Sequence, residues 1–364
     1  MDNVAHTLLG ATLAKAGLGR KTACSLPALM IAANLPDIDI FVAGNQGYFD
    51  HHRGITHSFV GVLGLSLALT GAFWIAGRMG FIAGRKQIRF LALWFISAIG
   101  ILSHLLLDVL GDYGLRPLLP FSPKWYYGDL LSIVDPWVWL VFGCSLFLAT
   151  ETKSGKTAWI AFACVLNTVI FFAAGRIFAL CWAIMALVIT GGMKALHRRA
   201  VNPSRAAFVL FFAYLGLAAT VHHAILLMAR QTGPLLVSDA ISKVSVLPGR
   251  PGTAGKWTVI LEGSDSYYVT DTGLKNWSLH PLKFERYPKN LRDECYLEAL
   301  KQPQMAALAR FARFPCVEVK VSGGLCQVLF RDLRYARSGT SSWAAETAIV
   351  PCNCRRKYTA IDHP

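Results

Sequence analysis

Apolar residues form long uninterrupted runs over the first 230 positions of the chain and short alternating runs afterwards. A run of about 20 apolar residues is long enough to cross a bilayer as an α-helix. Six such runs are expected to span a membrane, at residues 58–77, 90–110, 133–150, 157–174, 177–193 and 206–229. The pattern therefore predicts a polytopic transmembrane helix bundle.

Two shorter apolar segments precede these spans, at residues 3–17 and 25–43. The first is short for a full span, so it either crosses the membrane or is re-entrant. The second contains Pro36 between Asn34 and the carboxylates of Asp37 and Asp39. Proline and charge inside an apolar helix indicate an interrupted helix that lines a polar cavity.

The pattern changes at about residue 236. Short runs rich in β-branched and aromatic residues are typical of strands, and they lie at residues 243–248, 256–263, 266–270, 316–321 and 325–335. Residues 290–313 are expected to be helical. The chain is thus predicted to be mainly α, with an integral membrane domain over 1–235 and a smaller C-terminal α+β soluble domain, mostly β, over 236–364.

The charge distribution gives these spans an orientation. The chain is 54% hydrophobic, only 16% charged, and carries a net charge of +15. Its basic loops all fall on one side of the predicted bundle: residues 20–21, 78–89, 153–156 and 194–205. Basic loops are cytoplasmic in most membrane proteins, so the chain after residue 230 is expected outside the cytoplasm. No basic stretch is interleaved with aromatic residues, so nucleic acid is not an expected partner.

A histidine and an aspartate occur four residues apart in the second long span. His104 and Asp108 therefore project from one helix face, and one cation can contact both side chains. A structural hydrogen bond between helices is the simpler explanation of that pair alone. His6, Asp39 and His57 are, however, expected at the same membrane face. A shared depth of this kind favours a divalent metal site, with zinc the best match, and bridging carboxylates suggest more than one ion.

Further polar residues near this face are expected to assist the metal ligands. Asp37 is a candidate general base or orienting group, although a turn residue after proline is the simpler explanation. Arg53 is a candidate clamp for a phosphate, with a lipid headgroup contact as the alternative. His52, Thr56 and Asp135 are expected to support the ligands rather than to bind metal. We interpret His51 as an ordinary loop histidine, and His222 and His223 as packing residues.

Five of the nine cysteines lie in the tail, at positions 295, 316, 326, 352 and 354. If the tail lies outside the cytoplasm, some of them can form disulfides. Cys352 and Cys354 are too close in sequence for an easy bridge to each other.

The first 150 residues resemble a family of membrane-bound, metal-dependent hydrolases of bacterial inner membranes, also labelled LexA-binding. Four separated motifs carry this resemblance in order: His6-Thr7 with Gly10, residues 35–39, residues 52–58, and Ser103-His104 through Asp108. The family's pattern is distantly similar to zinc-dependent phospholipase C and P1-type nucleases. The resemblance implies metal ligation by His6, Asp39 (or Asp37), His57, His104 and Asp108. The later HxxxE helix of the soluble enzymes has no counterpart in this sequence.

These observations predict an inner-membrane, metal-dependent hydrolase. Its expected substrate is a phosphoester of a membrane lipid or another amphiphile that reaches the site at the outer face. The main alternative is a non-enzymatic, metal-stabilised membrane scaffold whose outer domain binds a partner. A secondary transporter ranks lowest, because interrupted helices would be expected in both halves and only the first half shows one.

Overall fold

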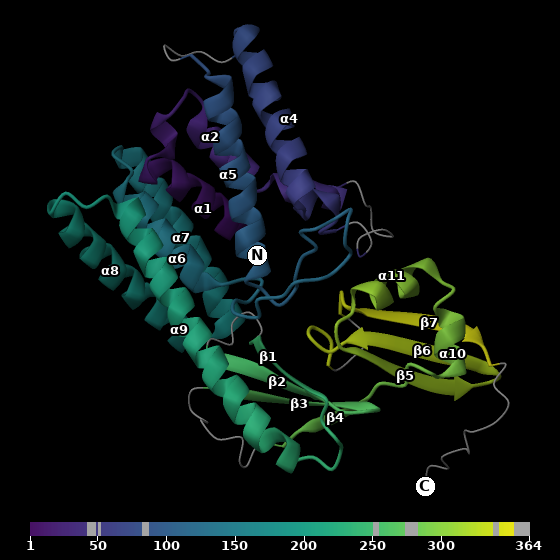
Figure 1. The fold of residues 1–364 in the computed structure, drawn as a ribbon. Coiled ribbons are helices and arrows are strands. Elements are labelled where there is room, and N and C mark those ends of the chain that lie inside the picture. The colour runs from purple at the N-terminus through teal and green to yellow at the C-terminus, as the bar shows by residue number, and fades with distance from the viewer. Residues whose placement is uncertain are drawn as a thin grey trace.

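A computed structural model describes residues 1–41, 49, 52–81, 87–249, 255–273, 283–337 and 342–352. The chain folds into a helical half and a C-terminal half built on two antiparallel sheets (Figure 1). The predicted fold class is confirmed.

Among the described residues, five helices are long and apolar enough to cross a membrane. They are α4 (Phe59–Arg78), α5 (Phe90–Val109), α7 (Lys153–Ala174), α8 (Arg176–Arg198) and α9 (Pro203–Thr232). The sixth expected span is the shorter helix α6 (Pro136–Leu148), with Asp135 capping its first turn. The shortening follows from this cap, since Asp135 accepts hydrogen bonds from two backbone amides and Pro136 fixes the start of the helix.

Two short helices lie against α5. They are α1 (Asn3–Ala16) and α2 (Ser25–Ala32), joined through a 3₁₀ turn, η1 (Leu18–Arg20). Glycines allow this close approach: a Cβ on Gly10 would lie 2.6 Å from the Leu29 carbonyl oxygen, and one on Gly100 2.6 Å from the Ala32 Cβ. Small residues at such crossings are typical of membrane helices. The predicted interruption is confirmed, because α2 ends at Ala32 and a 3₁₀ turn, η2 (Leu35–Ile38), follows.

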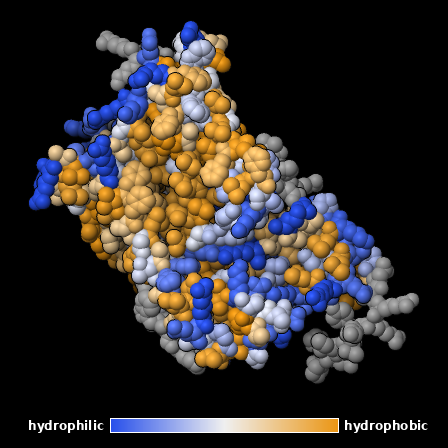
Figure 2. All heavy atoms as spheres, in the orientation of Figure 1, coloured by the Kyte–Doolittle hydropathy of each residue, from blue (hydrophilic) through white to orange (hydrophobic). Residues whose placement is uncertain are grey.

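The turns at the far end of the bundle pack against one another. Arg205 and Asn202, at the start of α9, donate hydrogen bonds to the carbonyls of Ala16 and Lys15, at the end of α1. The backbone amide of Arg89, before α5, donates to Thr22. This end lies opposite the sheets (Figure 1). An apolar surface covers the helices, and hydrophilic atoms gather at the far margin and over the C-terminal half (Figure 2).

The C-terminal half begins beyond η4 (Gly233–Leu235). Its first sheet has the order β1 (Lys243–Pro248), β2 (Lys256–Glu262), β3 (Ser266–Gly273) and β4 (Glu285–Pro288), and its second has β5 (Pro315–Ser322), β6 (Leu325–Asp332) and β7 (Ala345–Pro351). Helices α10 (Glu294–Ala299) and α11 (Pro303–Phe311) pack on the second sheet. The first sheet packs on the last turns of α9, where Ile225 and Ala229 share a core with Val259.

Candidate metal centre

Four polar side chains converge from three separate elements at one end of α5. Asp37 belongs to η2, and His57 ends another 3₁₀ turn, η3 (Ile55–His57). His104 and Asp108 lie one turn apart in α5. His57 and His104 have fully buried side chains, the Asp108 side chain is 1% exposed and that of Asp37 is 11% exposed. Asp37 is therefore the side chain of the four that a small molecule can reach from outside.

The two histidine nitrogens lie close to each other and to an oxygen of each carboxylate. His57 Nε2 lies 3.2 Å from His104 Nε2, 3.3 Å from Asp37 Oδ1 and 3.7 Å from Asp108 Oδ2. His104 Nε2 lies 3.6 Å from Asp37 Oδ1 and 3.4 Å from Asp108 Oδ2. Ligands about 2.1 Å from a tetrahedral zinc ion lie roughly 3.4 Å from one another. The spacing of each carboxylate oxygen from the two ring nitrogens is compatible with such an ion, and His57, His104 and Asp108 offer three ligand atoms that all lie within 4.8 Å of one another.

The hydrogen bonds of the Nδ1 atoms show how the imidazole rings of His57 and His104 are oriented. His104 Nδ1 lies 2.8 Å from the Ala33 carbonyl oxygen, so it carries the proton and Nε2 keeps a lone pair. His57 Nδ1 lies 3.0 Å from the Thr56 hydroxyl oxygen and 3.1 Å from Asp39 Oδ2, and because the Thr56 hydroxyl donates its own hydrogen to Asp39, Nδ1 carries the proton here too. The Nε2 atoms of both histidines thus lie close to one oxygen of Asp37 and one oxygen of Asp108. They repel one another unless a proton or a metal ion lies between them, so metal binding would displace a proton from His57.

His6 adds a fifth group beside these four. Its ring stacks on His104 with centroids 3.8 Å apart, and its Nε2 lies 3.4 Å from Asp108 Oδ1. Neither ring nitrogen of His6 makes a hydrogen bond, and neither does Asp108 Oδ2, although all three atoms are buried. Buried polar atoms without partners are costly, which is a second indication of a bound cation. The Met1 amino group also contacts Asp108 Oδ1.

Asp39 lies beside the Nδ1 atom of His57, on the side of the ring away from Asp37. Besides His57, its carboxylate accepts hydrogen bonds from the Thr56 hydroxyl and the Arg53 backbone amide, and it contacts His52 Nδ1 at 3.0 Å. Burial alone would raise the pKa of Asp39, but its bonds to His52 and His57 lower it below the usual range. For Asp37, burial is likewise outweighed by its bond to His57 and by the nearby His104, which lower the pKa to about 2. Both carboxylates are therefore ionised.

Arg53 is buried and already paired. Its Nη2 lies 3.0 Å from Asp108 Oδ1, and its Nη1 donates to the Gly114 carbonyl oxygen at 2.7 Å. Its guanidinium carbon lies 4.3 Å from the centroid of the Tyr113 ring. These contacts place a positive charge directly beside the metal-site carboxylate.

The C-terminal half packs on Tyr113, the residue that covers this arginine. The Tyr113 ring packs against Phe311 and Trp343. Arg334 pairs with Asp332 at 2.7 Å, both side chains being fully buried, and donates to the backbone carbonyls of Asp112 and Tyr113. We call Tyr113, Phe311, Trp343 and Arg334 the roof of the site. Sequence reasoning did not find these residues: it placed Asp332 and Arg334 only within the strand expected at residues 325–335, which gave no indication of what these two residues contact.

The remaining predicted residues fall in different places. Asp135 is not beside the ligand histidines among its described contacts: it caps α6 and accepts a hydrogen bond from Tyr214 at 2.7 Å. His222 contacts the Val246 carbonyl and the Trp257 ring, as expected of a packing residue. His51 lies outside the described residues.

Two apolar grooves flank α1. One, of about 410 Å³, is lined by Asn3, Ile31, Leu35, Asp37, Ile38 and Phe41 among others. Ile31, Ile38 and Phe41 are exposed to the surroundings, and Asp37 joins this groove to the metal cluster. The other, of about 600 Å³, lies between α1 and the first turns of α7, and Asn3 lines it too.

The apolar helices and the buried polar cluster define a multi-pass membrane protein. Residues 1–179 match the family model described as YdjM inner membrane protein, so the first half of the chain is similar to that inner-membrane family. All the candidate ligands lie within the matched region, and the C-terminal half lies outside it.

A relative from Bacillus subtilis (strain 168), described as uncharacterized protein YfhP, is 29% identical over 150 residues. The alignment covers 38% of this chain and 43% of that protein, so the chain spans less than half of the relative's length. No solved structure matches the chain. Neither description names an activity, so a functional proposal has to come from the site itself.

Proposed function

We propose that this protein is an inner-membrane, metal-dependent hydrolase that cleaves a phosphoester of a lipid or another amphiphile. The observation that carries the proposal is the convergence of Asp37, His57, His104 and Asp108, in which each carboxylate places an oxygen 3.3–3.7 Å from both histidine Nε2 atoms. A zinc-type ion bound there would polarise a phosphoryl oxygen and lower the pKa of water.

Asp39 and Asp37 would have different roles in this reaction. Asp39, with Thr56 and His52 around it, holds His57 in the tautomer that leaves Nε2 for the ion. Asp37 takes the place among the ligands that the sequence assigned to Asp39. Because Asp37 lines a groove, it is also the group that can accept a proton from an incoming water.

Arg53 would contribute to the same reaction through its contact with Asp108. Its bond to Asp108 Oδ1 leaves Oδ2 for the ion. Its charge also favours an anionic group at the cluster, since the guanidinium lies in a buried, weakly screened environment. The predicted role of Arg53 as an anion clamp is kept here as a proposal.

The groove beside Asp37 supports an amphiphilic substrate. Its exposed side chains, including Ile31, Ile38 and Phe41, lie on helices whose outer surface is apolar. A hydrocarbon chain can lie along them while its phosphoester reaches Asp37. A water-soluble phosphoester would gain nothing from such a groove.

The closed geometry of the cluster favours one other candidate function, a metal-stabilised scaffold without activity. Four protein ligands around one ion are typical of structural zinc sites, whereas catalytic sites keep a position open. Under this candidate, the metal would stabilise the packing of η2 and η3 against α5.

One experiment tests the metal and the activity together. The purified protein is measured by elemental analysis and on a panel of phosphodiester and phospholipid substrates, beside His104→Ala and the control His222→Ala. We expect bound metal and hydrolysis in the wild type and in His222→Ala, and neither in His104→Ala. Full metal content in His104→Ala would exclude the site, and metal without hydrolysis of any substrate would favour the scaffold.

The orientation of the chain is a separate proposal. The basic turns lie at the end opposite the sheets, and basic turns are cytoplasmic as a rule. We therefore place the metal cluster and the C-terminal half at the outer face. An alkaline phosphatase fused after residue 236 should be active, while a cytoplasmic reporter active at the same position would reverse the orientation.

A further inference from the structure

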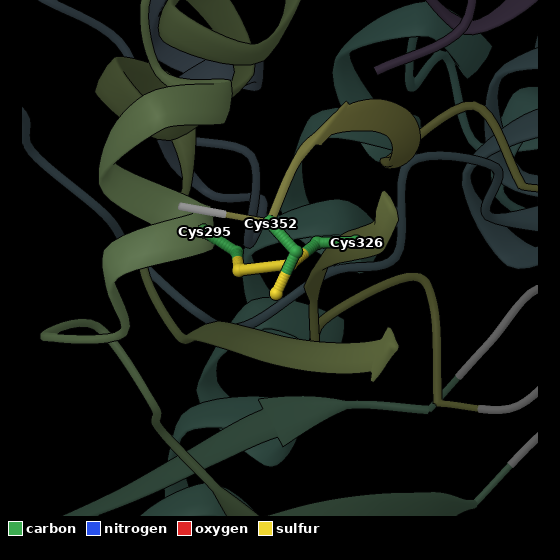
Figure 3. Close-up of side chains that lie close together, drawn as sticks. All are labelled: Cys295, Cys326 and Cys352. Atoms are coloured by element: carbon green, nitrogen blue, oxygen red, sulfur yellow. A yellow bond between two sulfur atoms is a disulfide. The ribbon is translucent and has the colours of Figure 1, made fainter. Parts of the chain in front are cut away.

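Three cysteines meet in the C-terminal half, away from the metal cluster. Cys295 and Cys326 form a disulfide, and the sulfur atoms of Cys295, Cys326 and Cys352 all lie within 4.8 Å of one another (Figure 3). The third sulfur is thus close enough to the disulfide to react with it.

Backbone register holds Cys352 in this position. Cys326 in β6 pairs with Val350 in β7, and Cys352 follows two residues later, so alternation places it on the same face of the sheet. The Cys352 amide donates to the Gly324 carbonyl oxygen at 2.9 Å, which extends the pairing beyond the end of β7. Cys295 reaches that face from the first turn of α10, which packs on β6 and β7.

The three sulfurs differ in access. Cys295 is 1% exposed and Cys326 is fully buried, whereas Cys352 is only partly buried. A thiol in solution therefore cannot reach the disulfide directly, but it can reach Cys352. Exchange between a thiolate and a disulfide depends on such access.

We propose that Cys295, Cys326 and Cys352 form a thiol–disulfide exchange site that reacts with a dithiol reductant. In the first step, the Cys352 thiolate attacks one sulfur of the disulfide. A new disulfide to Cys352 forms, the Cys295–Cys326 bond breaks, and the released sulfur leaves with the electron pair and takes up a proton. No oxidant or reductant is consumed in this step.

In the second step, the dithiol attacks the disulfide that now includes the accessible Cys352. Its first sulfur forms a mixed disulfide and releases a protein thiol. Its second sulfur then closes the reductant's own disulfide and releases the other protein thiol. The reductant loses two electrons and the protein gains two.

The exchange site shares an apolar core with the roof of the metal cluster. Cys295, Cys326, Phe311 and Tyr113 belong to this one core, and Tyr113 covers Arg53. Opening the disulfide would release α10 from β6 inside the core that holds Tyr113. The exchange site would thereby link thiol redox conditions to the roof, whatever reaction the metal cluster performs.

The test follows reduction of the full-length protein in detergent. All proteins compared carry Cys354→Ser, so that residue cannot take part. After timed exposure to dithiothreitol, samples are quenched in acid, alkylated and analysed by mass spectrometry. The reference is the protein that carries Cys354→Ser alone. We expect Cys352→Ser to lose the Cys295–Cys326 bond at least tenfold more slowly than this reference. The control Cys316→Ser should lose the bond at the reference rate.

A second variant tests proximity without kinetics. In Cys295→Ser, we expect a Cys326–Cys352 disulfide in the protein as purified. Reduction of Cys352→Ser at the reference rate would overturn the proposal, and so would two free thiols in Cys295→Ser. Stoichiometric zinc on three thiols of the wild type would replace the exchange site with a metal site.

Discussion

His57 and His104 direct their Nε2 atoms at each other across 3.2 Å, while an oxygen acceptor occupies the Nδ1 side of each ring. The acceptor is the Ala33 carbonyl for His104 and the Thr56 hydroxyl, with the Asp39 carboxylate beside it, for His57. Under the proposed function, the two rings would share one cation with the carboxylates of Asp37 and Asp108 beside them. This relationship separates residues that would touch the ion from residues that orient its ligands.

That separation predicts different metal affinities for two neighbouring aspartates. Asp37→Asn should lose most of the bound zinc, because it removes a charged donor from the cluster. Asp39→Asn should weaken zinc binding about 10- to 100-fold, as is typical when a group that orients a ligand is lost. Zinc affinity measured by competition with a chelator of known strength checks this order. Stronger zinc binding in Asp37→Asn than in Asp39→Asn would return Asp39 to the ligand set.

Arg53 should influence the substrate more than the metal. Arg53→Lys keeps the charge beside Asp108 but cannot bind an oxyanion through two parallel N–H groups. We expect near-normal zinc content and a KM for an anionic phosphodiester raised about tenfold, equivalent to about 1.4 kcal/mol. Arg78→Lys, at the other end of α4, is the matched control. An unchanged KM would show that Arg53 serves only to hold Asp108.

The groove beside Asp37 predicts a selective effect of a bulky side chain. Ile31→Trp should fill the groove and reduce hydrolysis of long-chain substrates at least tenfold, with little effect on short-chain, water-soluble phosphodiesters. Ile160→Trp, on the exposed apolar surface of α7 and outside both grooves, controls for bulk at the membrane surface. Equal losses on long and short substrates would mean that hydrocarbon chains do not use this groove.

The buried Arg334–Asp332 pair should stabilise the roof strongly. Arg334→Met leaves the Asp332 carboxylate buried without its partner, which costs about 3–5 kcal/mol. The control Arg331→Met breaks a bond to Glu318, whose side chain is 44% exposed, and should cost about 1 kcal/mol or less. Thermal midpoints in detergent compare the two variants. Similar midpoints would show that Arg334 does not anchor the halves together.

Asp112 predicts how stability depends on pH. Burial raises its pKa to about 6, although Arg334 opposes the shift. The folded protein therefore holds the Asp112 proton more tightly than the unfolded chain. The resulting stability is complete below about pH 4 and is lost as pH rises through 6, by up to about 3 kcal/mol.

Asp112→Asn removes this titration, so its effect is read as a difference from wild type. From pH 4 to 7, the thermal midpoint of the wild type should fall relative to that of Asp112→Asn. A constant gap between the two would show that Asp112 titrates near its ordinary value. Other groups titrate in both proteins, and their contributions cancel in the comparison.

The sequence predicted those features that depend on residues close together in the chain. Long apolar runs located α4, α5, α7, α8 and α9, and the i, i+4 spacing of His104 and Asp108 placed both on one helix face. Pro36 located the break after α2. Strands β1 and β5 were expected from their β-branched residues, whereas β4 was missed because its sequence, ERYP, contains none. Strand β7, AETAIVP, was missed although it contains Thr347, Ile349 and Val350.

The remaining features depend on three-dimensional arrangement. Asp37 and Asp39 are two residues apart in a tight turn, and only its path decides which carboxylate faces His104 and which lies behind His57. The pairing of Arg334 with the backbone near Tyr113 joins residues more than 200 positions apart. No local pattern encodes such a contact. Asp135 shows the reverse case, a carboxylate expected to hold a histidine but used to start α6.

The roof changes the medium in which the metal cluster operates. Tyr113 lies over Arg53, Phe311 and Trp343 pack against Tyr113, and Arg53 and Asp108 are almost completely buried. Charges attract and repel several times more strongly in such a low-dielectric environment than in water. Through Phe311, Trp343 and Arg334, the half of the chain that supplies none of the proposed ligands would thus strengthen the electrostatic interactions among them.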